Sequence, residues 1–149
     1  MNSKIKVAFD ILLVEDNSDD VFLTELALKK SFTSCKLTVA KNGQFALDLL
    51  YELIRENKKL PDLILLDINL PMLNGLEVLK EIKSDKVAKQ IPTVIFTNSD
   101  SRTDMTFCYN HGADLFIRKP NNINEFRRIM SYIKEQCFSQ ADKLPTGCP

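Results

Sequence analysis

Residues 63–79 read LILLDINLPMLNGLEVL and decide the fold. Four consecutive apolar residues at 63–66 predict a strand that is buried on both faces, and the carboxylate of Asp67 follows directly. Next come a proline and the Asn74-Gly75 pair, which favour a loop, and then apolar residues return at helical spacing. The stretch therefore predicts a strand, a loop and a helix, with an acidic side chain at the edge of a dry core.

The same alternation of apolar runs and helical patterns occurs five times along the chain. Runs typical of strands occur at residues 9–15, 36–40, 62–67, 92–97 and 114–118. Because the connections have helical length, the strands are expected to be parallel, with right-handed crossovers. The prediction is a doubly wound, flavodoxin-like α/β fold: a five-stranded parallel sheet in the order 2-1-3-4-5, with helices on both faces.

Helical spacing of apolar residues predicts amphipathic helices around residues 22–27, 46–54, 75–82 and 126–133. Ser18, Asp19 and Asp20 are candidate caps for the first of these helices. The segment from Asp100 to Gly112 carries the weakest helical pattern, and Gly112 is its predicted end. One helix is therefore expected after each strand.

One domain accounts for nearly the whole sequence. The chain has 149 residues, of which 44% are hydrophobic and 27% charged, values typical of a soluble globular domain. Residues 1–138 are expected to form this domain, and residues 139–149 (SQADKLPTGCP) a short polar C-terminal tail, with no output domain.

The charge balance and the cysteine pattern indicate which partners the protein is not expected to bind and where in the cell it is expected. Lys and Arg total 20, as do Asp and Glu, so direct DNA binding and attraction to an anionic membrane are not expected. No segment approaches a membrane span, and the acidic residues that close the N-terminal apolar run argue against a signal peptide. The four scattered cysteines lack zinc-ligand spacing, which favours a reduced, cytoplasmic location.

Polar side chains lie at the carboxyl ends of the predicted strands. Glu15 and Asp16 come at the end of the first strand and Asp67 at the end of the third. Thr97 ends the fourth strand, and Lys119 follows the fifth. In the order 2-1-3-4-5 the first and third strands are neighbours, so the three carboxylates are expected to meet where doubly wound sheets bind ligands.

This set of side chains indicates metal-assisted phosphoryl chemistry. Three carboxylates at close range need a proton or a cation in order to coexist. Oxygen-only ligands favour a hard ion, Mg²⁺ or Mn²⁺, over zinc, and a nearby lysine suits a phosphoryl anion. Phosphoryl transfer mainly needs positioning and charge neutralisation, and one of the carboxylates can act as the nucleophile.

Four motifs at these strand ends resemble the response-regulator receiver domain of two-component signalling. They are ILLVEDN with its acid pair, LLDINLPMLNG with its central aspartate, VIFTNSD with its threonine and ADLFIRKP with its lysine. The resemblance covers residues 9–138. The segment ILLVEDNSDDVFLTELALKK and the long second helix are more similar to the stand-alone regulators associated with phytochrome-type kinases.

The resemblance implies a function for the acidic residues. Asp67 would accept a phosphoryl group from a histidine of a sensor kinase or a phosphotransfer protein. The side chains of Asp16 and Asp67, with the backbone carbonyl of Asn69, would bind Mg²⁺, and Glu15 would act through water. Ser99 and Asn69 would flank the path of the water that removes the phosphoryl group.

The resemblance also implies a conformational switch. Thr97 would move inward to hydrogen-bond a phosphoryl oxygen, Lys119 would pair with another, and the aromatic side chain of Phe116 would turn inward with Thr97. The Lys119-Pro120 peptide bond would be cis. The changed surface of the last two helices and the last strand would then act on a downstream protein, or form a homodimer.

Each of these residues also has an ordinary structural interpretation. Asp67 alone could cap a loop, and Thr97 is a β-branched residue of the kind that favours strands. Lys119 could be solvated, and Phe116 could be a core residue. His111, the single histidine, is interpreted as structural or exposed. The combination at one sheet edge is what favours a functional site.

Three other functions are alternatives for the same residues. A phosphatase of the haloacid dehalogenase type would place a second acid two residues after its nucleophile, where this chain has Asn69. A flavin-binding module would need a phosphate-binding loop after the first strand, where Glu15 and Asp16 would repel phosphate. A degenerate receiver that only binds partners would not need the complete set of site residues.

Overall fold

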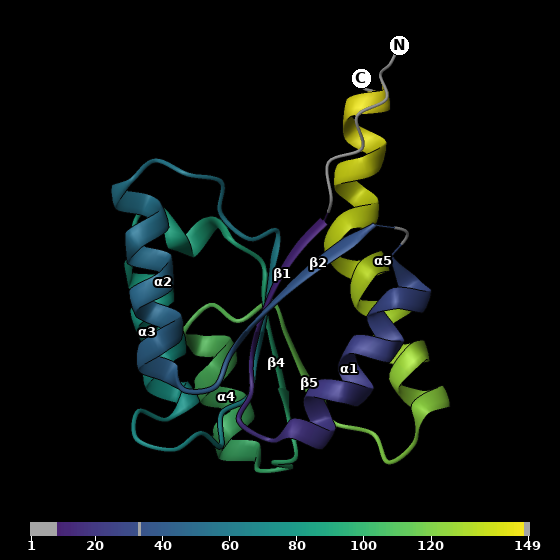
Figure 1. Cartoon of the computed structure of the whole chain (residues 1–149), viewed down its shortest axis with the longest axis horizontal. Coiled ribbons are helices and arrows are strands. Elements are labelled where there is room, and N and C mark those ends of the chain that lie inside the picture. The colour runs from purple at the N-terminus through teal and green to yellow at the C-terminus, as the bar shows by residue number, and fades with distance from the viewer. Residues whose placement is uncertain (1–8, 33, 148–149) are drawn as a thin grey trace.

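The computed structural model describes residues 9–32 and 34–147, and the side chains as far as residue 138. Five parallel strands form one sheet in the order β2-β1-β3-β4-β5, which confirms the predicted topology (Figure 1). The strands are β1 Phe9–Val14, β2 Cys35–Ala40, β3 Leu63–Leu66, β4 Thr93–Thr97 and β5 Leu115–Arg118. The helices are α1 Ser18–Ser31, α2 Gly43–Arg55, α3 Gly75–Ser84, the short 3-10 helix η1 Ala88–Gln90, α4 Arg102–Asn110 and α5 Ile123–Gly147.

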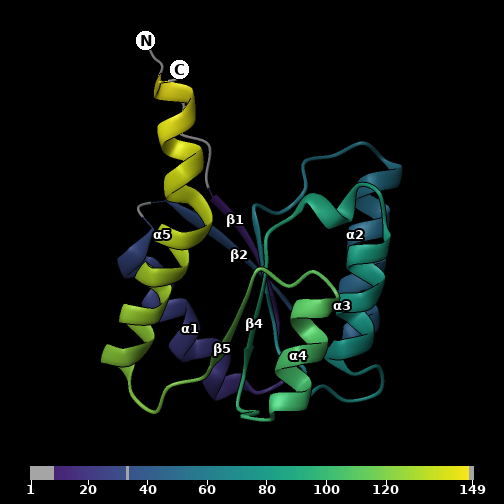
Figure 2. The same cartoon turned by 180° about the vertical axis from the view of Figure 1, so that it is seen from behind.

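Helices cover both faces of the sheet, as the sequence predicted. Figures 1 and 2 show α1 and α5 together on one face and α2, α3 and α4 on the other. Alternate residues of each strand enter opposite cores: Leu12 and Val14 of β1 pack beneath α2 and α3, whereas Ile11 and Leu13 pack beneath α1 and α5. All four residues of β3 are fully buried, because this strand is central and has helices on both sides.

Asparagine side chains begin the helices that follow the first three strands. Asn17 Oδ1 accepts a hydrogen bond from the backbone amide of Asp20 at 2.9 Å, so Asn17 is the cap of α1. The predicted caps of this helix, Ser18, Asp19 and Asp20, lie inside its first turn instead. The residues before α2 and α3 are also asparagines that cap their helices through the side chain.

Gly75 fixes the connection between β3 and α3. Its amide donates a hydrogen bond to the carbonyl of Ile68 at 3.0 Å. A Cβ atom at Gly75 would collide with the carbonyl oxygen of Asp67 and the Cα of Ile68, so only glycine permits this approach. The start of α3 therefore lies directly on the backbone of Asp67.

The structure bears on two expectations about the C-terminal part of the chain. No peptide bond in the described residues is cis, so the predicted cis form of Lys119-Pro120 is wrong. The trans form is the intrinsically favoured one even before proline. The expected tail from residue 139 begins as a continuation of α5, which runs to Gly147 and projects past the other helices (Figure 1). Cys148 lies outside the described residues.

Within the described part of the chain, no helix is long and apolar enough to cross a membrane.

Candidate functional site

Three carboxylates surround the ammonium group of Lys119 at the carboxyl edge of the sheet. Lys119 Nζ lies 2.5 Å from Glu15 Oε1, 2.8 Å from Asp20 Oδ2 and 2.9 Å from Asp67 Oδ2. Glu15 follows β1, Asp67 follows β3, Lys119 follows β5, and Asp20 belongs to the first turn of α1. The parallel sheet brings these residues together because the carboxyl ends of all its strands lie at one edge.

Burial shapes the charge of this cluster. Glu15, Asp67 and Lys119 are all buried. Burial raises the pKa of Glu15 to about 7, although the hydrogen bond and the charge of Lys119 act in the opposite direction. Burial alone would lower the pKa of Lys119, but its hydrogen bonds to Asp20, Glu15 and Asp67 raise it above its ordinary value. Lys119 is therefore a permanent cation at neutral pH.

Glu15, Asp16 and Asp67 form a group of oxygens suited to a metal ion. Each offers a carboxylate oxygen, and these oxygens all lie within 4.8 Å of one another. Asp16 is exposed while the other two are buried, so the group opens to solvent at Asp16. An oxygen-only donor set with one open side fits a hard divalent cation that keeps some of its water ligands. The residues present thus fit a divalent metal.

Asn69 links Asp67 to Thr97 through hydrogen bonds. Asp67 Oδ1 accepts a hydrogen bond from the amide of Asn69 at 3.0 Å. The side-chain amide of Asn69 donates to Thr97 Oγ1 at 3.4 Å, and the amide of Ser99 donates to the same hydroxyl at 3.3 Å. Thr97 is fully buried. The structure therefore brings the predicted residues Asn69, Thr97 and Ser99 to the same edge as the acids.

Phe116 lies on β5, three residues before Lys119, and is not part of the polar cluster. Its side chain is partly buried against the core beneath α2, α3 and α4. Its backbone amide donates a hydrogen bond to the hydroxyl of Tyr109 on α4 at 3.0 Å. Phe116 therefore packs as a core residue, as its structural interpretation predicts.

Asp20 is a site residue that the sequence analysis missed. The sequence indicates it only as a candidate helix cap, whereas its carboxylate accepts a hydrogen bond from Lys119 at 2.8 Å. The spacing between Asn17 and Asp20 carries information, because an Asn cap fixes where the helix begins and hence which way its first turn faces. Which lysine Asp20 would meet depends on the tertiary fold.

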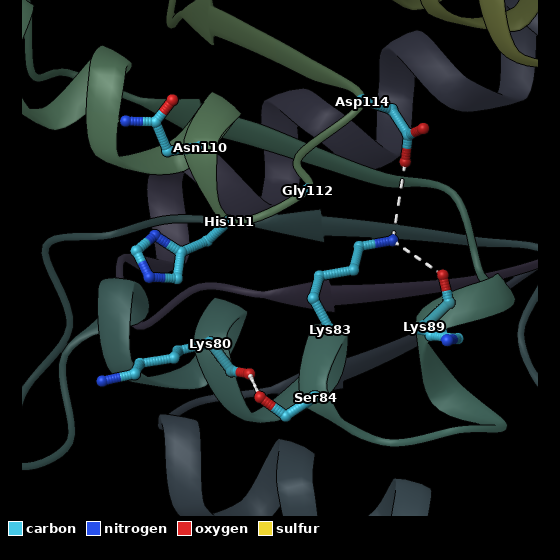
Figure 3. Close-up of a pocket in the computed structure, with 8 residues that line it drawn as sticks. All are labelled: Lys80, Lys83, Ser84, Lys89, Asn110, His111, Gly112 and Asp114. Carbon is cyan, nitrogen blue, oxygen red and sulfur yellow. Dashed lines mark hydrogen bonds and ion pairs between the residues drawn. The ribbon is translucent and has the colours of Figure 1, made fainter.

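A depression of about 500 Å³ lies away from this cluster, at the ends of α3 and α4 (Figure 3). Asp114 in its lining precedes β5, whereas Lys119 follows β5, so the depression is at the opposite edge of the sheet. Lys83 Nζ donates to the carbonyls of Lys89 and Ile91 at 3.1 and 2.9 Å and pairs with Asp114 at 3.7 Å. Lys83 therefore joins the loop before β4 to the start of β5, which is a structural role.

Metal affinity is expected to increase with pH because of Glu15. A metal ion favours the ionised carboxylate, and the pKa of Glu15 is about 7 in the metal-free protein. The apparent Kd for Mg²⁺ or Mn²⁺ should be roughly tenfold weaker at pH 6 than at pH 8, the ratio of the ionised fractions. Calorimetric titration at several pH values measures it. Glu15→Gln should bind more weakly and lose this pH dependence, and an unchanged dependence in the variant would contradict the assignment.

The sequence of the chain is similar to those of known signalling proteins. A family model described as the response regulator receiver domain matches residues 11–131. Response regulator Rcp1 of Synechocystis sp. is 35% identical over 138 residues, which cover 92% of this chain and 93% of Rcp1. The sequence expectation of a receiver domain similar to phytochrome-associated regulators is thereby confirmed.

Solved structures agree with this relationship. The phosphorylated cyanobacterial phytochrome response regulator RcpA is similar with a TM-score of 0.81 and 36% identity, over 90% of this chain and 96% of that one. The Mn²⁺-bound form of response regulator Rcp1 is similar with a TM-score of 0.75 and 32% identity, over 87% of this chain and 95% of that one. The chain belongs to the family of response regulator receiver domains.

Proposed function

We propose that this protein is a phosphorylation switch in which Asp67 accepts a phosphoryl group from a phosphohistidine of a sensor kinase or phosphotransfer protein. The observation that carries the proposal is the position of the Asp67 carboxylate, 2.9 Å from the buried ammonium of Lys119 and within the oxygen group of Glu15 and Asp16. A nucleophile placed between a cation and a metal site is what phosphoryl transfer needs.

In this reaction an oxygen of Asp67 attacks phosphorus and the phosphorus–nitrogen bond of the donor breaks, leaving its electron pair on the imidazole. Asp67 Oδ1 is oriented by the amide of Asn69 at 3.0 Å. Lys119, already in contact with Oδ2, would donate to a phosphoryl oxygen of the product. The lysine thus balances negative charge both before and after transfer.

The side chains of Asp16 and Asp67 and the carbonyl of Asn69 would hold Mg²⁺, and Glu15 would act through water. The oxygens of the three acids lie within 4.8 Å of one another, and Mn²⁺ fits the same ligands. When bound, the metal ion would offset the charge of the carboxylates and of the incoming phosphoryl group. The chain would catalyse only its own phosphorylation and a slow hydrolysis, so its product is a changed protein surface.

Thr97 and Phe116 would transmit the change. For its hydroxyl to reach a phosphoryl oxygen, Thr97 must alter its contacts with Asn69 and Ser99, at 3.4 and 3.3 Å. Phe116 would then turn inward and change the surface formed by α4, β5 and α5. Tyr109 and Tyr132 on that surface are each about half exposed and are available to a downstream protein or to a second copy of the chain. We place the switch in the cytoplasm, without direct contact with DNA or a membrane.

Intact mass after incubation with a small phosphodonor tests this function. With Mg²⁺ the protein should gain one phosphoryl group per chain, and without a divalent metal or with a chelator it should gain none. A matched incubation of denatured protein controls for non-specific labelling. No gain with metal present would leave the fold intact but replace the proposed function with partner binding alone.

A further inference from the structure

Asp20 occupies a particular place in the cluster around Lys119. Its carboxylate contacts the ammonium at 2.8 Å, between the distances of Glu15 (2.5 Å) and Asp67 (2.9 Å). The side chain of Asp20 is 21% exposed, whereas those of Glu15 and Asp67 are 2% and 6% exposed. Asp20 is therefore the carboxylate on the solvent side of the lysine.

Asp20 also differs from the other acids in its relation to the metal site. The oxygens that lie within 4.8 Å of one another come from Glu15, Asp16 and Asp67, and Asp20 does not belong to that group. A metal ion bound there would compete with Lys119 for Glu15 and Asp67, but it would leave Asp20 on Lys119. The negative charge of Asp20 thus remains beside the lysine when the site is ready to react.

The negative charge of Asp20 opposes the attraction of small anions to the positive charge of Lys119 and the metal site. A lysine ammonium next to a divalent ion would attract any small phosphorylated molecule, even from a buried position, since opposite charges attract over several ångströms. Asp20 offsets one positive charge at the entrance. A phosphohistidine carried by a docked protein depends less on this attraction, because the protein interface holds it in place.

We propose that Asp20 is a specificity-determining residue that makes the site less reactive toward small anionic phosphodonors and so favours a donor presented by a protein. The inference rests on the proposed function, in which Asp67 is phosphorylated. It predicts an effect that depends on charge: removal of the Asp20 charge should help a doubly charged donor more than a singly charged one.

The expected size follows from Coulomb's law. For a doubly charged donor near the lysine, removing one negative charge about 6 Å away in a water-like medium changes the rate by roughly tenfold, and by roughly threefold for a singly charged donor. Salt should reduce both effects, because Asp20 is partly exposed. A merely structural role of Asp20 would show neither dependence.

The experiment compares phosphorylation rates of wild type, Asp20→Asn, Asp20→Ala and Asp20→Glu at saturating Mg²⁺ with acetyl phosphate and with phosphoramidate, at low and high salt. Asp19→Asn is the matched control, because Asp19 lies in the same helical turn and is exposed. It loses the same charge at the helix N-terminus without a contact to Lys119. Intact mass gives the rates, and circular dichroism confirms that each variant is folded.

The result expected is faster phosphorylation of Asp20→Asn and Asp20→Ala, most clearly with acetyl phosphate at low salt, and near wild-type rates for Asp20→Glu and Asp19→Asn. Equal rates in Asp20→Asn and wild type, or an acceleration by Asp19→Asn of the same size, would overturn the inference. So would a slower Asp20→Ala, which would make Asp20 a support for Lys119. If wild type itself gains no phosphoryl group, the proposed function fails, and that outcome is distinct from all of these.

Discussion

Asp67→Asn should lose phosphoryl uptake from any donor, with the rate falling by roughly a thousandfold or more, as expected when a nucleophile is removed. The change removes the attacking oxygen charge but keeps the size of the side chain. Incubation of wild type and variant with a small phosphodonor and Mg²⁺, followed by intact mass, measures the loss. Uptake by the variant at the wild-type rate would move the acceptor to another residue, such as Asp16 or Glu15, whose carboxylate oxygens lie within 4.8 Å of one of Asp67.

The loss should not come from unfolding. Asp67 accepts hydrogen bonds from Asn69 and Lys119 on its two oxygens, and an asparagine can accept only one of them. The substitution also removes one of three acids that repel one another, and this offsets the lost hydrogen bond. The free energy of unfolding should therefore stay within about 1 kcal/mol of wild type. Urea denaturation tests this. Asp48→Asn, a change on the exposed face of α2, is the control for both measurements.

Lys119→Met should lower the free energy of unfolding by about 3–5 kcal/mol in the absence of metal, the usual effect of removing one partner from a buried ion cluster. Three acids would then face each other without their cation. The pKa of Lys119 is raised in the folded state. Its stabilising contribution is therefore fully present at neutral pH and is lost only as alkaline pH passes through the raised pKa. Urea denaturation at neutral pH measures the difference.

Divalent metal should restore part of this stability, because it supplies the charge that the variant lacks. Protonation of the acids should have the same effect. The destabilisation should therefore shrink as the pH falls below the pKa of Glu15, which is about 7. Lys83→Met is the matched control: Lys83 is also mostly buried, but it donates to backbone carbonyls at the other edge of the sheet. Its loss should be insensitive to Mg²⁺. Equal metal responses of the two variants would contradict the assigned role of Lys119.

Much of the site could be predicted because the carboxyl ends of parallel strands lie at one edge of the sheet. Glu15, Asp67, Thr97 and Lys119 are far apart in sequence, yet each lies at the carboxyl end of a strand, and the predicted strand order brought them together. The strand bounds differed by a residue at several ends, which did not matter because the site depends on where the strands end in space.

The residues that sequence reasoning missed depend on side-chain direction. Asp20 reaches Lys119 because Asn17, and none of the residues after it, begins α1 and so sets the rotation of its first turn. The contact between Tyr109 and the backbone of Phe116 depends in the same way on how α4 packs beside β5. Apolar periodicity locates a helix but leaves such details undetermined. The continuation of α5 through residues 139–147 was also missed, because that stretch is polar and contains a proline.

The contact of Gly75 with the backbone of Asp67 gives the switch a direction. The peptide of the acceptor is held beneath the first turn of α3, where no side-chain atom separates the two backbones. The close packing of the two backbones therefore opposes a shift of the Asp67 main chain when its carboxylate is modified. Movement of side chains on phosphorylation is therefore expected on the other side of the site, among the groups that follow β4 and β5. The first turn of α3 would thus stay in place while the response to phosphorylation appears at α4.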